Sequence, residues 1–215
     1  LGTLTSESSE PANRWSSLYK AISRSLKILN ALETKALNIP HSKFVQYKGE
    51  AYFMIGFAYG ELATYFGDCV LNKTGMSLDE AYTASRSPRR DVFNFAYACL
   101  DSAAADLLFT YTGEQRPTKG AALGFKTRFA LCAGDYQLAA DAARKCMNLG
   151  VYKLQDNYLD LFKADSSPEL LFYFKGNLSQ KYGISPFDGI KNFVIRKLGG
   201  YANMSPSLEL LCSYT

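Results

Sequence analysis

The sequence is poor in the side chains and motifs on which catalysis usually depends. Its 215 residues include a single histidine, His41, and contain no HExxH, GxSxG, GxGxxG or P-loop pattern. His41 lies in a Pro-His-Ser turn, where a position at the start of a helix explains it. Acidic residues are numerous enough to supply a glycosidase pair, but nothing singles out two of them. We therefore expect no enzyme activity, no metal site and no cofactor.

Long hydrophobic runs and blocks of one charge are also missing. No stretch of about 18 apolar residues could span a bilayer as a helix. No block of Lys and Arg accompanies the net charge of +4, which leaves no argument for a nucleic-acid partner. The five cysteines form no CxxC pair, and Cys99, Cys132 and Cys146 occupy apolar positions of expected helices. We interpret these three as small buried hydrophobic residues.

Apolar residues recur at intervals of three and four over the first 150 residues, which predicts α-helices. Side chains that can cap a first turn precede these helices, and glycines follow several of them. The expected helices span about residues 13–33, 42–66, 88–108, 119–133 and 136–149. In the same order, the residues expected to cap them are Asn13, Ser42, Ser87, Thr118 and Asp135. A short helical turn is also expected near Leu78–Tyr82, within a loop over residues 68–86.

Glycines in the second expected helix indicate close helix packing. Gly49, Gly56 and Gly60 each weaken that helix by roughly 1 kcal/mol relative to Ala, and the close approach of a neighbouring helix would compensate. The same helix carries Glu50, which we expect to pair with a basic residue of another helix, for example Arg128.

The turn between the last two expected helices indicates their arrangement. Gly134-Asp135 leaves room only for a tight turn, so the two helices must form an antiparallel hairpin. The phrase Gly134-Asp135-Tyr136-x-x-Ala139 resembles the start of the second helix in a tetratricopeptide (TPR) unit. After Gly150, which ends the hairpin, glycines and prolines make the pattern irregular.

The predicted fold class is therefore mainly all-α. We expect TPR-like stacked helical hairpins followed by an irregular C-terminal segment. Within that segment, Leu170–Phe174 is a compact apolar run that suits a buried strand or a packed extended segment.

A series of phrases along residues 15–174 resembles the SusD/RagB family of outer-membrane nutrient-binding lipoproteins. The order and spacing of the phrases carry the resemblance more than any one of them. The sequence departs from the family pattern after Phe53 and after Asp68, which concerns local geometry rather than the fold. The phrases are Trp15-x-x-x-Tyr19-x-x-Ile22, Gly49-Glu50-Ala51-x-Phe53, Tyr65-Phe66-Gly67-Asp68, Ser85-Arg86-Ser87, Asp91-Val92-Phe93, Arg116-Pro-Thr118-Lys119-Gly-Ala121-Ala122, Gly134-Asp135-Tyr136, Gly150-x-Tyr152-x-Leu154, Tyr158-x-x-Leu161-Phe162 and Glu169-Leu-Leu-Phe172.

The resemblance implies a function and a location. It implies a non-catalytic protein that captures glycan, or another nutrient oligomer such as a peptide, and delivers it to a SusC-like TonB-dependent transporter. It also implies a surface-exposed lipoprotein of the outer membrane, whose leader and lipidated cysteine are not in this chain. Residues 1–165 correspond to the TPR-like helical domain, and residues 166–215 to the incomplete start of the C-terminal portion. Because family members are much longer, the chain is expected to be truncated at both ends.

A sugar site needs flat aromatic faces and convergent polar groups. The candidates are Asn13, Trp15, Tyr82 and Tyr201, which lie in irregular segments or near the start of the first helix. Two alternatives stay open. A TPR-like helical adaptor would bind a protein or peptide partner instead, and its gene would lack a signal peptide with a lipobox cysteine. A glycoside hydrolase would cleave oligosaccharides, which we do not expect.

Overall fold

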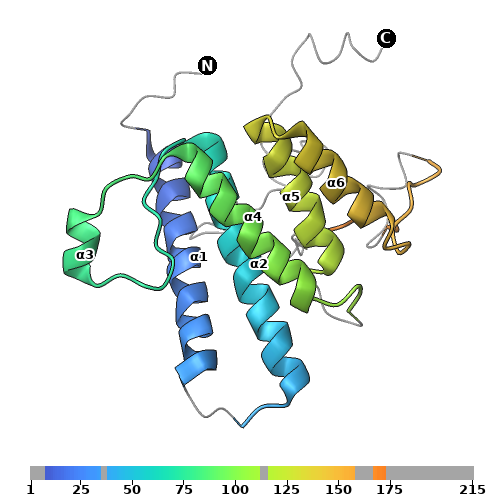
Figure 1. Ribbon diagram of the computed structural model, residues 1–215, viewed down its shortest axis with the longest axis horizontal. Coiled ribbons are helices and arrows are strands. Elements are labelled where there is room, and N and C mark those ends of the chain that lie inside the picture. The colour runs from blue at the N-terminus through green and yellow to red at the C-terminus, as the bar shows by residue number, and fades with distance from the viewer. Residues whose placement is uncertain (1–7, 35–37, 112–115, 158–166, 173–215) are drawn as a thin grey trace, which may run out of the picture. The chain divides into compact units, whose positions relative to one another are not determined.

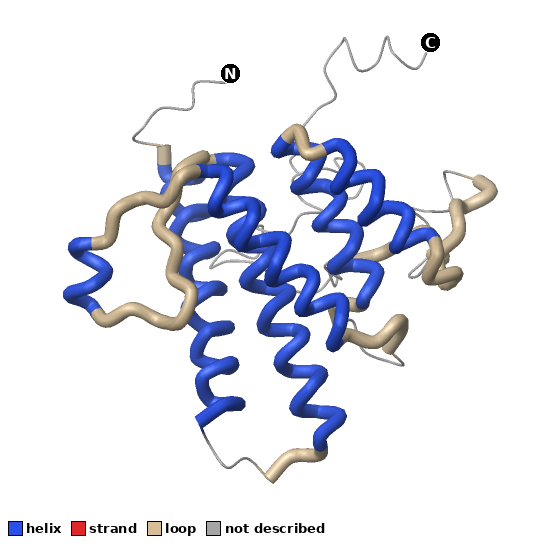
Figure 2. Tube along the Cα trace, viewed as in Figure 1, coloured by secondary structure: helices blue, strands red, loops and turns tan. Residues whose placement is uncertain are grey.

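The computed structural model describes residues 8–34, 38–111, 116–157 and 167–172 (Figures 1 and 2). Within these ranges the regular structure is helical, and the one extended pairing is an isolated antiparallel bridge between Cys69 and Ser87. This confirms the all-α fold class. No helix in the described part of the chain is long and apolar enough to cross a membrane. The helices are α1 (Ser9–Thr34), α2 (His41–Tyr65), α3 (Leu78–Thr83), α4 (Arg89–Asp106), α5 (Lys119–Ala133) and α6 (Tyr136–Met147).

Helix α2 is the centre of the packing, because it contacts α1, α4 and α5. Successive long helices lie side by side in Figure 1, and the α5–α6 pair forms the antiparallel hairpin expected from Gly134. Gly134 has a φ of 83°, the left-handed conformation that ends α5. The core is therefore built from pairs of helices stacked on one another.

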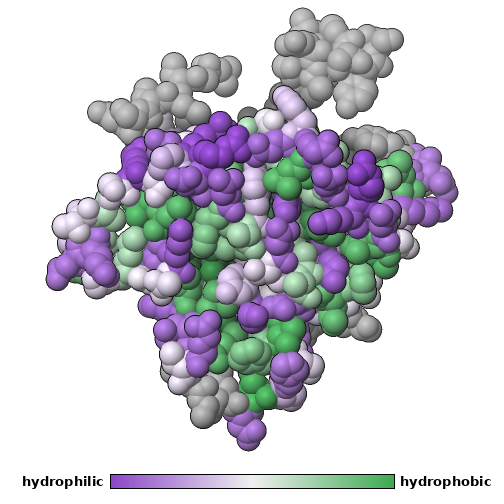
Figure 3. Space-filling view, in the orientation of Figure 1, coloured by the Kyte–Doolittle hydropathy of each residue, from purple (hydrophilic) through white to green (hydrophobic). Residues whose placement is uncertain are grey.

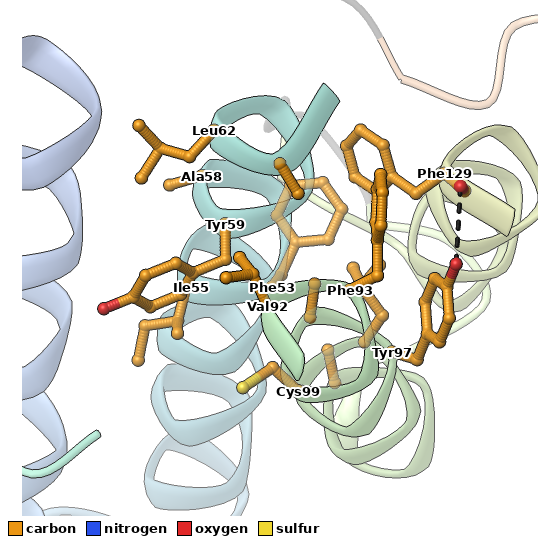
Figure 4. Close-up of a cluster of buried hydrophobic side chains, with 14 of the residues drawn as sticks. Phe53, Ile55, Ala58, Tyr59, Leu62, Val92, Phe93, Tyr97, Cys99 and Phe129 are labelled. Carbon is orange, nitrogen blue, oxygen red and sulfur yellow. Dashed lines mark hydrogen bonds between the residues drawn. The ribbon is translucent and has the colours of Figure 1, made fainter. Parts of the chain in front are cut away.

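The core lies where α2, α4 and α5 meet (Figure 4). From α2, Phe53 and Tyr59 are fully buried, and Phe93 of α4 and Phe129 of α5 are 1% exposed. Tyr97 also lies here, and its hydroxyl donates to the carbonyl of Phe129 over 3.4 Å. The four largest fully buried side chains of this core are thus aromatic.

Three glycines let the neighbours of α2 approach its backbone. A Cβ at Gly56 would lie 2.7 Å from the Cγ of Leu100, and one at Gly49 would lie 3.0 Å from the Cβ of Asp106. A Cβ at Gly60 would overlap the ring of Phe129. The predicted close approach is confirmed, and two helices, α4 and α5, make it.

The helix starts agree with the sequence only in part. Thr118 caps α5 as predicted, because its side chain accepts from the backbone N–H of Ala121. The predicted cap at Asn13 is wrong, since α1 already begins at Ser9. The predicted cap at Ser42 is also wrong: Pro40 is the N-cap residue of α2, and its carbonyl accepts from the backbone N–H groups of Lys43 and Phe44.

Two further caps differ because their side chains or backbones have other partners. Ser87 pairs through its backbone with Cys69, and α4 begins one residue later than predicted, at Arg89. The carboxylate of Asp68 accepts from the N–H of Arg89 over 2.8 Å and so caps α4 from another part of the chain. Asp135 is the N-cap residue of α6, but its side chain makes no capping bond.

Several smaller expectations can be compared directly. The short helix near residue 80 is confirmed as α3. Cys99 is buried as predicted, whereas Cys132 is exposed and Cys146 is only half-buried, because α5 and α6 turn those faces away from the core. Residues 170–172 form no strand, and Phe172 packs instead against Phe53 with ring centroids 5.3 Å apart. The predicted domain boundary after residue 165 lies outside the described residues and stays a prediction.

Two adjacent arginines at the start of α4 hold the ends of neighbouring helices. Arg89 donates to the carbonyls of Ala63 (2.9 Å) and Cys132 (3.2 Å), at the C-terminal ends of α2 and α5. These carbonyls have no partner within their own helices, so a cation suits them. Arg90 donates to both carboxylate oxygens of Asp135, at 2.7 and 2.6 Å. Together the two side chains fasten α4 to the α5–α6 hairpin.

Gly60 and Gly124 should respond to alanine with opposite signs. Gly60→Ala should destabilise the full-length protein by about 1–3 kcal/mol, because the new methyl meets the buried ring of Phe129. At Gly124 a Cβ meets only the end of the Leu171 side chain, at 2.9 Å. Gly124→Ala should therefore stabilise by about 0.5–1 kcal/mol through helix propensity. Urea unfolding measures both, and a stabilising Gly60→Ala would contradict this packing.

The Arg90–Asp135 pair should make stability depend on acid pH. Hydrogen bonds from the Arg90 guanidinium hold the pKa of Asp135 below the ordinary aspartate value. A carboxyl whose pKa falls on folding stabilises the protein above its unfolded pKa, about 3.9, and the contribution is lost as pH drops through the folded pKa. Below about pH 4, the thermal midpoint should therefore fall more steeply for the wild type than for Asp135→Asn. Equal slopes would show that the pair contributes nothing.

Candidate ligand-binding surface

Trp15 lies in an aromatic cluster where the start of α1 meets the end of α2. Its ring centroid is 5.0 Å from that of Tyr19 and 5.1 Å from that of Phe66, whose ring meets it edge-on. The guanidinium carbon of Arg86 lies 5.6 Å from the Trp15 ring centroid, within the range of a cation–π contact. The half-buried indole is thus held between two helices and the segment that precedes α4.

Beside this cluster, Tyr65 presents a more open ring. Its side chain lies at the end of α2 and the residue is 61% exposed. The guanidinium carbon of Arg14 lies 5.8 Å from the centre of the ring. Arg14 also forms an ion pair with Glu61, whose side chain is only 5% exposed. The buried carboxylate of Glu61 thus fixes the position of Arg14. The guanidinium of Arg14 in turn lies beside the exposed ring of Tyr65.

Two tyrosine hydroxyls fix the segment that follows α2. Tyr59 accepts from the backbone N–H of Asn72 over 2.7 Å and donates to the carbonyl of the same residue over 3.0 Å. Tyr19 donates to the carbonyl of Val70 over 2.9 Å. Burial raises the pKa of both tyrosines far above the ordinary value, so both hydroxyls keep their protons at any physiological pH. Residues 70–72 are consequently bound to the core.

Between its two fixed ends, this segment carries α3 away from the other helices. The backbones of Cys69 and Ser87 join the ends by two hydrogen bonds of 3.3 and 2.9 Å. Figure 1 shows α3 at the far end of the resulting arch, and Figure 3 shows hydrophilic side chains at its outer edge. Ser77 and Glu80 form a capping box at the start of α3. On this helix Tyr82 is 81% exposed, so its aromatic ring is accessible to a ligand.

Chemically reactive groups are scarce around this surface. Burial raises the pKa of the Cys69 thiol, which disfavours the reactive thiolate. Within the described ranges, no group of three His, Cys, Asp or Glu side chains is placed to hold a metal ion. Exposed aromatic rings and arginines can bind a ligand by stacking and hydrogen bonds without any such group.

The predicted site residues do not all come together. Asn13 is exposed, and two residues along a helix correspond to about 200° of rotation, so Asn13 and Trp15 lie on different sides of α1. Tyr82 has no ring contact with Trp15, although Arg86, four residues further along the chain, reaches the Trp15 ring. Tyr201 lies outside the described residues. That these four residues bind a ligand stays a prediction.

Sequence reasoning missed Tyr65, Arg14 and Arg86. Arg86 stands in the Ser85-Arg86-Ser87 phrase, so a signal for it was present. The Arg14–Glu61 pair joins residues 47 positions apart, so no local sequence pattern predicts it. Glu50 does pair with a basic residue, but the partner is Arg116, just before α5 and 2.9 Å from the Glu50 carboxylate, and the example Arg128 is wrong. Arg128 lies two turns into α5, near Phe125.

A family described as "Starch-binding associating with outer membrane", named SusD-like, has a sequence model that matches residues 3–131, more than half of the chain. The chain belongs to the SusD-like family. Its relatives include the SusD-like protein P2 of Formosa agariphila, which is 26% identical over 188 residues, or 81% of this chain and 37% of that protein. The resemblance proposed from the sequence is therefore confirmed.

Solved structures of SusD-like proteins share the fold. A SusD superfamily protein from Bacteroides thetaiotaomicron aligns with a TM-score of 0.73 at 24% identity, over 90% of this chain and 43% of that one. A SusD-like carbohydrate binding protein from Bacteroides fragilis aligns with a TM-score of 0.67 at 26% identity, over 74% of this chain and 31% of that one. The chain thus spans less than half the length of these relatives.

Removing the Tyr59 hydroxyl should loosen the segment without disturbing the aromatic core. Tyr59→Phe leaves the backbone N–H and C=O of Asn72 without their partner and should cost about 1–3 kcal/mol. Amide hydrogen exchange should accelerate at Asn72, which is the direct readout. Tyr65→Phe removes an exposed hydroxyl and serves as the control. Unchanged exchange at Asn72 in Tyr59→Phe would contradict the role assigned to this hydroxyl.

Proposed function

We propose that this chain is part of a non-catalytic protein that captures glycan at the bacterial surface. The match to the SusD-like family over residues 3–131 is the observation that carries the proposal. A structural relative at 26% identity is a carbohydrate binding protein. The exposed rings of Tyr65 and Tyr82, and the guanidinium of Arg14 beside Tyr65, supply the stacking faces and donors that a sugar requires.

The proposal extends to a partner and a location. The captured oligosaccharide passes to a SusC-like TonB-dependent transporter in the outer membrane, and a lipid anchor outside this chain holds the protein at the membrane surface. The description of the family, which refers to the outer membrane, supports the location. In this arrangement the helices act as a frame that carries ligand-binding segments, with residues 1–165 as the TPR-like domain and residues 166–215 as the start of the C-terminal portion.

Absence of catalysis is part of the proposal. Stacking and hydrogen bonding hold a sugar but break no bond, and hydrolysis would need two carboxyl groups placed across the scissile bond. In the arch and its surroundings Glu61 is buried against Arg14 and Glu80 is held in the capping box. These two carboxylates therefore have structural partners.

The test is glycan binding by the full-length protein, with two exposed tyrosines compared. Tyr82 is 81% exposed on α3, and Tyr136 is 72% exposed on α6. After a glycan array identifies a ligand, calorimetry should show that Tyr82→Ala weakens binding about tenfold or more, the loss expected for one aromatic stacking contact. Tyr136→Ala should bind like the wild type, and the glycan should remain uncleaved.

Three results would contradict the proposal in different ways. Binding of peptides but of no saccharide would favour the helical adaptor. Cleavage of the bound oligosaccharide would make the protein an enzyme. If Tyr82→Ala and Tyr136→Ala lost the same amount of affinity, the protein would still be a glycan-binding protein. The ligand surface would then not include α3.

A further inference from the structure

A groove runs between α1 and the residues that follow the Tyr59-bound part of the loop. Its floor and walls include Ser23, Lys27 and Asn30 on one side, and Asn72, Thr74 and Met76 on the other. The three α1 residues are spaced four and three apart, which places them on one face of the helix. The groove encloses about 450 Å³, within the usual size of a small-ligand site.

The lining of this groove mixes polar and apolar side chains and carries one kind of charge. Leu26, Ala31 and Met76 supply its apolar part. Hydroxyls come from Ser23 and Thr74, amides from Asn30 and Asn72, and an ammonium from Lys27. No carboxylate is among the lining residues, and no described acidic side chain lies within ion-pair distance of Lys27. Such a set of groups matches a polyhydroxylated ligand that also carries a negative charge.

Hydrogen bonds hold Asn72 and Gly75 on the loop side of the groove. Tyr59 holds the backbone of Asn72 by two hydrogen bonds, and the Oδ1 of Asn72 accepts from the N–H of Gly75 over 2.7 Å. Gly75 has a φ of 113°, which favours glycine and closes the turn. With its oxygen used inside the turn, the Asn72 amide keeps its N–H groups as donors. A preformed wall of donors lowers the entropic cost of binding.

The acidic side chains of the arch lie away from this groove. Arg86 lies against the ring of Trp15 near the start of α1, about three helical turns from Lys27. On the opposite side of the arch, Glu80 is engaged with Ser77 in the capping box, and Asp79 is its exposed acidic neighbour. The acidic groups of the arch thus lie on α3.

We propose that the groove between α1 and residues 72–76 binds an anionic sugar residue, with Lys27 pairing with its carboxylate or sulfate group. The inference rests on the proposed function and specifies its substrate class: glycans that bear uronic acids or sulfate esters. The amides and hydroxyls of the groove hold the sugar hydroxyls, and Lys27 selects the charge. The carboxylate and the sulfate share this chemistry, and experiment distinguishes them.

The experiment measures the affinity of the full-length protein for three oligosaccharides of equal length: one neutral, one with uronic acid residues, and one with sulfate esters. Calorimetry is carried out on the wild type, Lys27→Gln, Lys27→Arg and the control Lys145→Gln, which changes an exposed lysine of α6. Lys27→Gln should weaken binding of the anionic ligand about tenfold or more, the loss expected for a charge-assisted hydrogen bond. Binding of the neutral ligand should not change.

The remaining variants separate charge from structure. Lys27→Arg should restore most of the affinity, Lys145→Gln should match the wild type, and circular dichroism should be alike for all four proteins. Raising the salt concentration should weaken anionic binding more in the wild type than in Lys27→Gln. A loss confined to the uronate ligand, or to the sulfated one, supports the inference and identifies the group that is recognised.

Two outcomes overturn the inference and can be told apart. If neutral and anionic oligosaccharides bind with equal affinity and Lys27→Gln changes neither affinity, the groove does not recognise charge. The proposed glycan capture would still be supported. If no oligosaccharide binds at all, the proposed function fails together with the inference.

Discussion

The hydroxyl of Tyr59 connects the interior of this protein to its candidate ligand-binding surface. The ring is fully buried in α2, and the oxygen at its far end binds both backbone groups of Asn72. A polar atom at such a depth is costly unless it is satisfied, and here the loop satisfies it. The position of residues 70–76, and with it the groove beside α1, consequently depends on how the core holds one aromatic side chain.

The core can hold Tyr59 firmly because α2 is enclosed by α1, α4 and α5. Gly56 and Gly60 allow this, since any side chain at either position would push α4 or α5 away. Arg89 and Arg90 then fix the ends of the same helices through carbonyls and through Asp135. The close packing and the contacts at the helix ends both hold these helices together. The arch from Cys69 to Ser87 is attached to these packed helices.

Local patterns were enough to predict the parts of the fold that local chemistry decides. The Thr118 cap, the left-handed Gly134 and the hairpin it closes follow from a few adjacent residues. The start of α4 does not, because its cap is supplied by Asp68, 21 residues earlier. Asn13 failed as a cap for a related reason: helical geometry continues upstream to Ser9, and a good capping residue inside a helix caps nothing.

The candidate site was harder to predict than the fold. Trp15 was chosen for its aromatic ring, but the structure uses much of that ring to join α1, α2 and Arg86. Tyr65 gains its importance from exposure and from Arg14, which depends on a buried partner in another helix. The groove near Lys27 depends on the course of a loop. Each of these is a tertiary property, and a single sequence contains no separate signal for it.

We propose that the ligand surface of this SusD-like protein includes α1 and the arch over residues 69–87. The most direct test is a crystal structure of the full-length protein with a bound oligosaccharide. We expect sugar rings in contact with the arch and with the face of α1 that carries Lys27. An oligosaccharide bound with no contact to either element would contradict it.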